Sequence, residues 1–197
     1  ETGTLQLRVL VGGEYSEGCF HRIAGTLTVL RLEVLGAEIS TALDDVAIDR
    51  FHVVDHDFDG PATEFRIEVI NDAICDAVRR NVSVRQFAGR HRVYGRADAA
   101  EPVSNFPTRV VVDNQSSPSR TIVDVFAHDR PGLLYTISRT LFQLGHSVEL
   151  ARIATHVDQV VDVFYVVDRE GRKILDAARV EEIVERLETA ITHLQRH

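Results

Sequence analysis

Val125-Phe-Ala-His-Asp129-Arg-Pro-Gly132-Leu-Leu134 joins an apolar, β-branched run to an amphipathic segment, which predicts a strand followed directly by a helix. Asp129 can cap that helix, and the proline suits its first turn because the missing N–H is no loss there. The N–H groups of Gly132, Leu133 and Leu134 would point at the loop and, with the helix dipole, hold a carboxylate. Asp129 could accept an ammonium group, so the stretch offers both groups that a free α-amino acid requires.

These residues resemble the effector loop of ACT domains, which are small regulatory modules that bind amino acids. A longer series of motifs is similar to the C-terminal tandem ACT region of the bifunctional uridylyltransferase/uridylyl-removing enzymes that modify the PII nitrogen-signalling protein. The series consists of residues 111–115, 121–125, 129–135, 151–155 and 161–168. The resemblance covers residues 108–194 well and the first hundred residues weakly. It implies ferredoxin-like ACT units that sense glutamine.

Composition sets wider bounds on the function. The chain has 197 residues, 44% of them hydrophobic and 26% charged, which is typical of a soluble globular protein with one large or two small domains. A net charge of −8 makes the chain a poor candidate for binding nucleic acid or an anionic membrane. We find no signal peptide and no apolar run near the roughly 18 residues of a spanning helix. Cys19 and Cys75 have no metal-ligand or CxxC spacing, so we expect two reduced thiols in a cytoplasmic protein.

The pattern of apolar residues predicts strands and helices in a repeated order. Strands are expected over residues 5–11, 33–43, 46–55, 108–113 and 121–127, with a hairpin formed by 147–157 and 159–168. Helices are expected over residues 20–30, 65–80, 132–144 and 178–194. In the helix over residues 65–80, the buried face is expected to consist of Ile67, Ile70, Ile74, Ala77 and Val78.

The two halves of the chain align with each other. Asp49 and Phe51 fall on Asp162 and Phe164 at an offset of 113 residues. The first helix of each half aligns at an offset of 114 residues, which places Gly18 on Gly132, Ile23 on Ile137 and Leu27 on Leu141. Such steady offsets indicate a duplication. Each copy has the order β-α-β-β-α, which is the ferredoxin-like βαββαβ plan without its last strand.

We therefore predict an α+β fold of two ACT units with antiparallel sheets that helices cover on one face. The first, degenerate unit would occupy residues 1–80, a basic and Pro-containing linker 81–107, and the second unit 108–197. The missing strands could come from residues 82–87 or 92–94, or from 108–113, which we favour as an edge strand that ties the two sheets together. Residues 79–96 hold six arginines and no acid, a pattern that fits a surface for RNA or for an acidic partner, or a solvated linker, which we favour.

The resemblance also implies which residues bind a ligand. In ACT pairs the ligand lies where the loop of one unit meets the second strand of its neighbour. The implied binding residues are Asp129, Arg130, Gly132, Leu133 and Leu134 in the loop, with Ile153 and Thr155, or Ile39 and Thr41, lining the side-chain pocket.

The corresponding loop of the first unit departs from this pattern. It reads Tyr15-Ser-Glu17-Gly18, so the aspartate and the proline are both missing. Glu17 would also place a negative charge close to the expected position of a ligand carboxylate. We therefore expect one principal site per chain.

Other motifs favour simpler interpretations. Asp55-His-Asp-Phe-Asp59 resembles a metal cluster, but it follows a strand, and we favour a water-facing acidic turn. The sequence contains no Walker motif, GxGxxG, nucleophile elbow or carboxylate pair typical of acid/base catalysis. We expect no catalytic residue, metal or cofactor in this chain.

The function predicted from these observations is an amino-acid-sensing regulatory region, with glutamine as its ligand. The chain begins at Glu1 and lacks methionine, so we expect a piece of a longer protein whose catalytic domains are its partners, with a second copy of the chain as a further candidate partner. The alternative is a ligand-free dimerisation or interaction module. An RNA-binding ferredoxin-like domain fits poorly, because Phe164 and Tyr165 are adjacent and would face opposite sides of their strand.

Overall fold

The computed structural model describes residues 4–12, 18–41, 46–57, 60–79, 107–153, 155–156 and 159–196. We call residues 4–79 the first unit and residues 107–196 the second unit. The elements follow the predicted order, except that the strand expected over residues 147–157 is divided into two. In chain order they are β1 (Thr4–Gly12), α1 (Cys19–Val29), β2 (Leu32–Thr41), β3 (Val46–Asp55), α2 (Glu64–Arg79), β4 (Arg109–Asp113), β5 (Thr121–His128), α4 (Leu133–Gln143), β6 (Ser147–Arg152), β7 (Thr155–His156), β8 (Gln159–Val167) and α5 (Ala177–Arg196).

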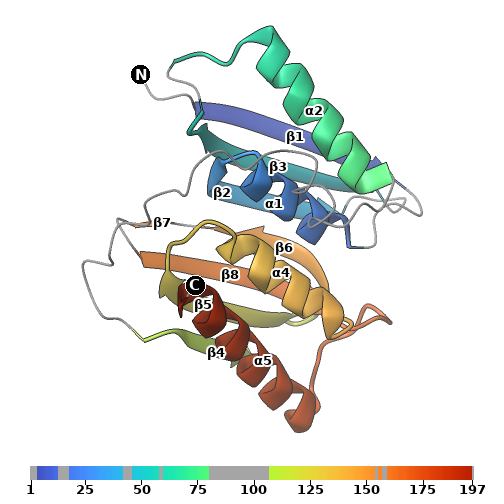
Figure 1. Ribbon diagram of the computed structural model, residues 1–197. Coiled ribbons are helices and arrows are strands. Elements are labelled where there is room, and N and C mark those ends of the chain that lie inside the picture. The colour runs from blue at the N-terminus through green and yellow to red at the C-terminus, as the bar shows by residue number, and fades with distance from the viewer. Residues whose placement is uncertain are drawn as a thin grey trace.

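The described strands form one antiparallel sheet rather than two. Its order is β1-β3-β2-β6-β8-β5-β4, and β7 pairs with β8. The order β1-β3-β2 of the first unit is reversed in the second unit as β6-β8-β5, so a pseudo-twofold axis passes between β2 and β6. Helices α1, α2, α4 and α5 all lie on one face of the sheet, with α1 and α4 side by side in the middle (Figure 1). The predicted α+β fold is confirmed.

The two units are joined through β2 and β6, at the pair Glu38 and Arg152. The prediction that residues 108–113 tie two sheets together is therefore wrong. In the described sheet β4 pairs with β5 alone, at the far edge, and it supplies the missing fourth strand of the second unit from a position before β5 in the sequence. The candidate strands over residues 82–87 and 92–94 lie outside the described residues, as does most of the predicted linker.

The core consists of the residues on the helix-covered face of the sheet and the apolar stripe of each helix. Phe51 of β3 and Phe164 of β8 occupy matched positions, and both are fully buried. In α2 the predicted face is correct except for Ile67, which is 51% exposed. Phe65 is also exposed, so the apolar side chains of the first turn of α2 extend past the packed core.

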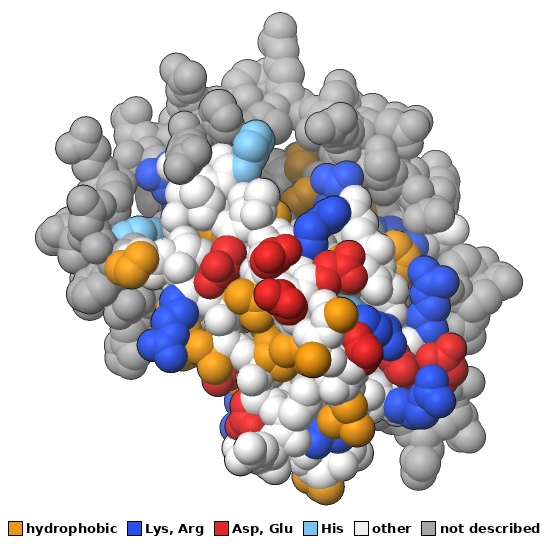
Figure 2. Space-filling view, turned by 90° about the horizontal axis from the view of Figure 1, so that it is seen from below, with side chains coloured by type: hydrophobic (Ala, Val, Ile, Leu, Met, Phe, Trp, Pro, Cys, Tyr) orange, Lys and Arg blue, Asp and Glu red, His pale blue; other side chains and the backbone are white. Residues whose placement is uncertain are grey.

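The edge of the molecule formed by β4 and α5 carries much acidic surface. Seen from below, acidic side chains gather near the middle of this face, beside hydrophobic ones (Figure 2). Lys and Arg side chains surround the acidic ones on the same face, so its charge is mixed (Figure 2).

A buried ion pair links the end of β3 to the start of α2. Arg66 donates from Nε to Asp55 Oδ2 at 2.7 Å and from Nη2 to Asp55 Oδ1 at 3.0 Å. The Arg66 Nη2 group also donates to the carbonyl oxygen of Leu30 at 2.7 Å, so the same side chain holds the end of α1. The second unit repeats this pair more loosely, with Arg179 Nη1 3.8 Å from Asp168 Oδ2. Asp55 is therefore buried and paired rather than part of a water-facing acidic turn.

We expect Arg66→Met to lower the free energy of unfolding by roughly 3–5 kcal/mol, because it leaves the buried Asp55 carboxylate without its counter-charge. Urea unfolding measures this change. The matched control is Arg50→Met, which removes an exposed ion pair to Glu38 (Nη1 to Oε2, 2.7 Å) and should cost less than about 1 kcal/mol. Equal losses in the two variants would contradict a structural role for the Arg66 pair.

Candidate functional site

The predicted effector loop has the expected strand-to-helix geometry with a different cap. Helix α4 begins at Leu133, and its N-cap is Gly132, whose φ of 87° lies in the left-handed region that favours glycine. The helix has no side-chain cap hydrogen bond, so the prediction that Asp129 caps it is wrong. The turn is closed instead by the backbone, with the Leu133 N–H donating to the Arg130 carbonyl at 3.0 Å. Asp129 lies before this turn, which leaves its carboxylate available to the loop.

The backbone donors of the loop are fewer than predicted. The Leu133 N–H already has an acceptor, and the Thr136 N–H donates to the Gly132 carbonyl at 2.9 Å. Among the described residues the structure gives no acceptor for the N–H groups of Gly132 and Leu134, so these two remain as donors for an anion. The side chains of Leu133 and Leu134 pack in the core, so only their backbone faces the loop region.

Two carboxylates from different units lie near each other at this loop. Burial raises the pKa of Asp129, the nearby carboxylate of Glu33 raises it further, and a backbone hydrogen bond from Arg130 lowers it. Glu33 is on β2 of the first unit, and its Oε2 lies 2.5 Å from Nε2 of His56. A cation placed between Asp129 and Glu33 would relieve their repulsion. An ammonium group is therefore the complementary ligand group.

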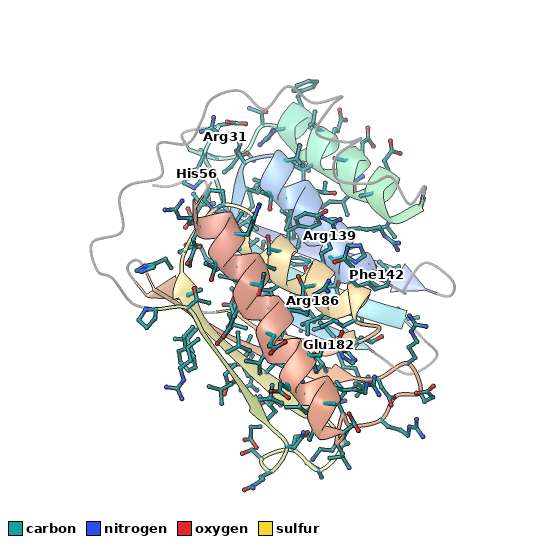
Figure 3. All side chains as sticks on the ribbon, turned by 60° about the horizontal axis from the view of Figure 1, so that its bottom comes forward. Arg31, His56, Arg139, Phe142, Glu182 and Arg186 are labelled. Carbon is teal, nitrogen blue, oxygen red and sulfur yellow. The ribbon has the colours of Figure 1, made fainter. Side chains whose placement is uncertain are left out.

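The first unit also contributes the end of α1 to this region. A Cβ atom at Gly132 would lie 3.5 Å from Cγ2 of Thr28, so the loop touches α1 through the Thr28 methyl group. The Thr28 hydroxyl is turned away, because it donates to the Ala24 carbonyl at 2.9 Å. Arg31, which follows α1, has a left-handed φ of 58°, and its carbonyl accepts a hydrogen bond from the His56 N–H. Arg31 and His56 lie at one end of the α1–α4 pair, whereas Phe142 lies toward the other end (Figure 3).

The predicted pocket residues lie at different places along the central strands. Ile153 follows β6, and its carbonyl oxygen is 3.7 Å from the position of a Cβ at Gly36, in the first half of β2. Ile39 is buried in the core, six residues beyond Glu33, which is roughly 20 Å along a strand. The side chains of Thr41 and Thr155 lie outside the described residues.

The structure thus brings Asp129, Gly132 and Leu134 together with two residues that the sequence did not single out, Thr28 and Glu33. Neither residue belongs to a motif, and both enter the site only because β2 pairs with β6. The pairing of these strands was the missing signal.

The candidate metal cluster has other partners. Asp55 pairs with Arg66, His56 with Glu33, and Asp57 Oδ1 with Arg31 Nε at 3.3 Å. In the part of the chain that the structure describes, no group of three or more His, Cys, Asp or Glu side chains could hold a metal ion. None of the helices described there has the length and apolarity that a membrane crossing requires.

A buried carboxylate lies beneath the first turn of α1. Cys19 Sγ is 3.9 Å from Asp49 Oδ2, and both residues are buried. Burial raises the pKa of Asp49 to about 7, while the thiol contact lowers it. Burial, together with the Asp49 charge, raises the pKa of Cys19 to about 12, so the thiol stays protonated. The second unit has Asp162 at the matched position, also buried.

We expect Asp49→Asn to be more stable than the wild type at pH 8, with the advantage shrinking toward pH 4. The folded protein binds the Asp49 proton more tightly than the unfolded chain, whose pKa is near 3.8, so wild-type stability falls as the pH rises from 3.8 through 7. The gain could reach about 4 kcal/mol, since each pKa unit corresponds to about 1.4 kcal/mol. Thermal unfolding from pH 4 to 8 measures it, and Asp72→Asn, at an exposed position of α2, is the control. A pH-independent difference between wild type and Asp49→Asn would contradict this interpretation.

Comparison with known proteins agrees with the fold and with the tandem arrangement. Residues 109–196 match the family model described as an ACR9-like, ACT-like domain. The bifunctional uridylyltransferase/uridylyl-removing enzyme of Rhodospirillum rubrum is 33% identical over 184 residues, which are 93% of this chain and 19% of the relative. The enzyme of the same name from Novosphingobium aromaticivorans is 37% identical over 174 residues, covering 86% of this chain and 18% of the relative. The chain therefore spans about a fifth of the length of these curated relatives.

A solved structure supports the fold. The aspartate kinase from Synechocystis superposes with a TM-score of 0.53 at 15% identity, covering 96% of this chain and 28% of the kinase. At this level of identity the likeness concerns the fold alone. Taken with the sequence matches, it shows that the chain has an ACT-like fold and that most of the chain is similar to one part of the bifunctional uridylyltransferase/uridylyl-removing enzymes.

Proposed function

We propose that this chain is an amino-acid-sensing regulatory region, with glutamine as its ligand, in a parent protein that attaches and removes uridylyl groups. The observation that carries the proposal is the meeting of the Asp129–Leu134 loop of the second unit with Thr28 and Glu33 of the first unit. A ligand bound there would contact both units at once. The curated relatives, which carry both activities in their name, support the choice of parent protein.

The site would divide the amino acid between its two charged groups. The N–H groups of Gly132 and Leu134, at the positive end of α4, would bind the carboxylate. Asp129 and Glu33 would bind the ammonium group from opposite sides. Ile153 would face the ligand side chain, whereas Ile39 lies too far along β2 from Glu33 to do so. This chain would supply no catalytic residue of its own.

Regulation would follow from the position of the site between the units. A ligand shifts an equilibrium only through its different affinities for the two states. Because the ligand would contact α1 and β2 of one unit and α4 of the other, it would favour the arrangement in which these elements are close. The attached catalytic domains would respond to that arrangement.

The alternative function is a ligand-free module that holds the parent protein together. The internal hydrogen bond of the Leu133 N–H favours it, because the loop turn is closed without a ligand. Ligand titration distinguishes the two functions.

We expect the chain to bind glutamine saturably in a calorimetric titration, with glutamate and isoleucine as controls. Asp129→Asn and Glu33→Gln should each weaken binding by roughly tenfold or more, since a charge-assisted hydrogen bond contributes about 1.5–3 kcal/mol. Glu38→Gln is the matched control, because Glu38 is on the same strand and pairs with the exposed Arg50. If the folded chain binds none of the amino acids, the ligand-free function replaces the sensor.

Affinity for glutamine should also fall as the pH is lowered into the acid range. The raised pKa of Asp129 means that part of the free protein carries a proton there at mildly acidic pH, and an ammonium ligand must displace it. Repeating the titration at several pH values measures this effect. An affinity that Asp129→Asn lowers equally at every pH would show that Asp129 does not titrate in the free site.

A further inference from the structure

The α1–α4 interface has two ends that the pseudo-twofold axis relates. At an offset of 114 residues, Gly18 corresponds to Gly132 and Thr28 to Phe142. The start of α4 touches the end of α1 at Thr28, and the start of α1 touches the end of α4 at Phe142. The duplication therefore created two candidate sites, one at each end. They differ in what fills them.

The space beside Gly132 borders the small side chain of Thr28, whereas the space beside Gly18 borders two aromatic rings. A Cβ at Gly132 would be at an ordinary contact distance of 3.5 Å from Thr28. A Cβ at Gly18 would lie 2.8 Å from both the His21 and the Phe142 rings, which is too close for any side chain. These two rings stack on each other, with centroids 4.5 Å apart and an angle of 28° between their planes. Phe142 and the ring of His21 thus occupy the space beside Gly18.

His21 stays neutral in this position. Burial, together with the smaller effects of the Arg22 and Arg139 charges, lowers the pKa of His21 to about 4. Its Nδ1 atom is buried and has no hydrogen-bond partner in the described part of the chain. An uncharged imidazole can behave as an aromatic packing group, and a stacked pair of rings stabilises an interface beyond the area it buries.

We propose that the His21–Phe142 stack blocks the position beside Gly18 at this end of the α1–α4 interface, although Phe142 keeps 36% of its surface exposed, so that the chain takes one amino acid, at the Gly132 end. The closed end then acts as a fixed contact, and only the open end changes when a ligand binds. The single-ligand part rests on the proposed function, whereas the closure stands on the packing alone.

Hydrogen exchange tests the closure without any ligand. Phe142→Ala should raise amide exchange at least tenfold near the start of α1 and the end of α4, and it should lower the melting temperature by roughly 2–4 °C for each kcal/mol lost. Phe65→Ala, which removes a phenylalanine that is 71% exposed on α2, is the matched control and should leave exchange at both sites unchanged. Wild-type exchange in Phe142→Ala would overturn the closure.

A phenylalanine introduced at position 28, beside Gly132, tests whether the chain has a single ligand site. Thr28 corresponds to Phe142 at the other end of the interface, so Thr28→Phe places a phenylalanine at both ends. The variant should abolish glutamine binding while the chain stays folded. The wild type should bind one glutamine per chain, and two would overturn the proposal. If the wild type binds no amino acid, the proposed function fails, while the exchange experiment still decides the closure.

Discussion

The antiparallel pairing of β2 with β6 is the contact on which the arrangement of this molecule depends. It joins two half-sheets into one and places α1 beside α4 on the same face. The pseudo-twofold axis through this pairing then requires the start of each helix to lie against the end of the other. The effector loop acquires its neighbours Thr28 and Glu33 in this way, from residues about a hundred positions away. A single unit would have the loop without its opposite wall.

The two copies keep their framework and differ where a ligand would bind. Fully buried phenylalanines at matched positions in β3 and β8 and Asp–Arg pairs at the ends of these strands occur in both units. These groups are buried or paired, so changing one partner alone is costly. In the second unit, the side chains of Asp129 and Arg130 are only half-buried, so this part of the loop carries no such cost. One loop therefore retains Asp129 and its backbone donors, while the other end is packed with His21 and Phe142.

The buried and partly buried aspartates of this fold have different surroundings. Asp55 is paired with Arg66, which binds it through two hydrogen bonds. Among the described residues, the hydrogen-bond partner of Asp49 is the Cys19 thiol, and burial raises the pKa of Asp49 to about 7. Asp129 is intermediate, being partly buried and close to Glu33. This last arrangement suits a site whose missing charge arrives with a ligand.

Local patterns in the sequence predicted the elements, their repeated order and the turn at Gly132. The period of the apolar residues, the turn residues and the duplication are all properties of the sequence itself. They did not predict the cap, because the Leu133 N–H at the start of α4 donates to the Arg130 carbonyl and not to the Asp129 side chain. They also misplaced β4, because a strand's partner depends on which edge is free and not on its own residues. The sequence by itself determined the duplicated α+β units and one half of the candidate site. The tertiary structure decided the other half, because Thr28 and Glu33 meet the loop only when β2 and β6 share an edge.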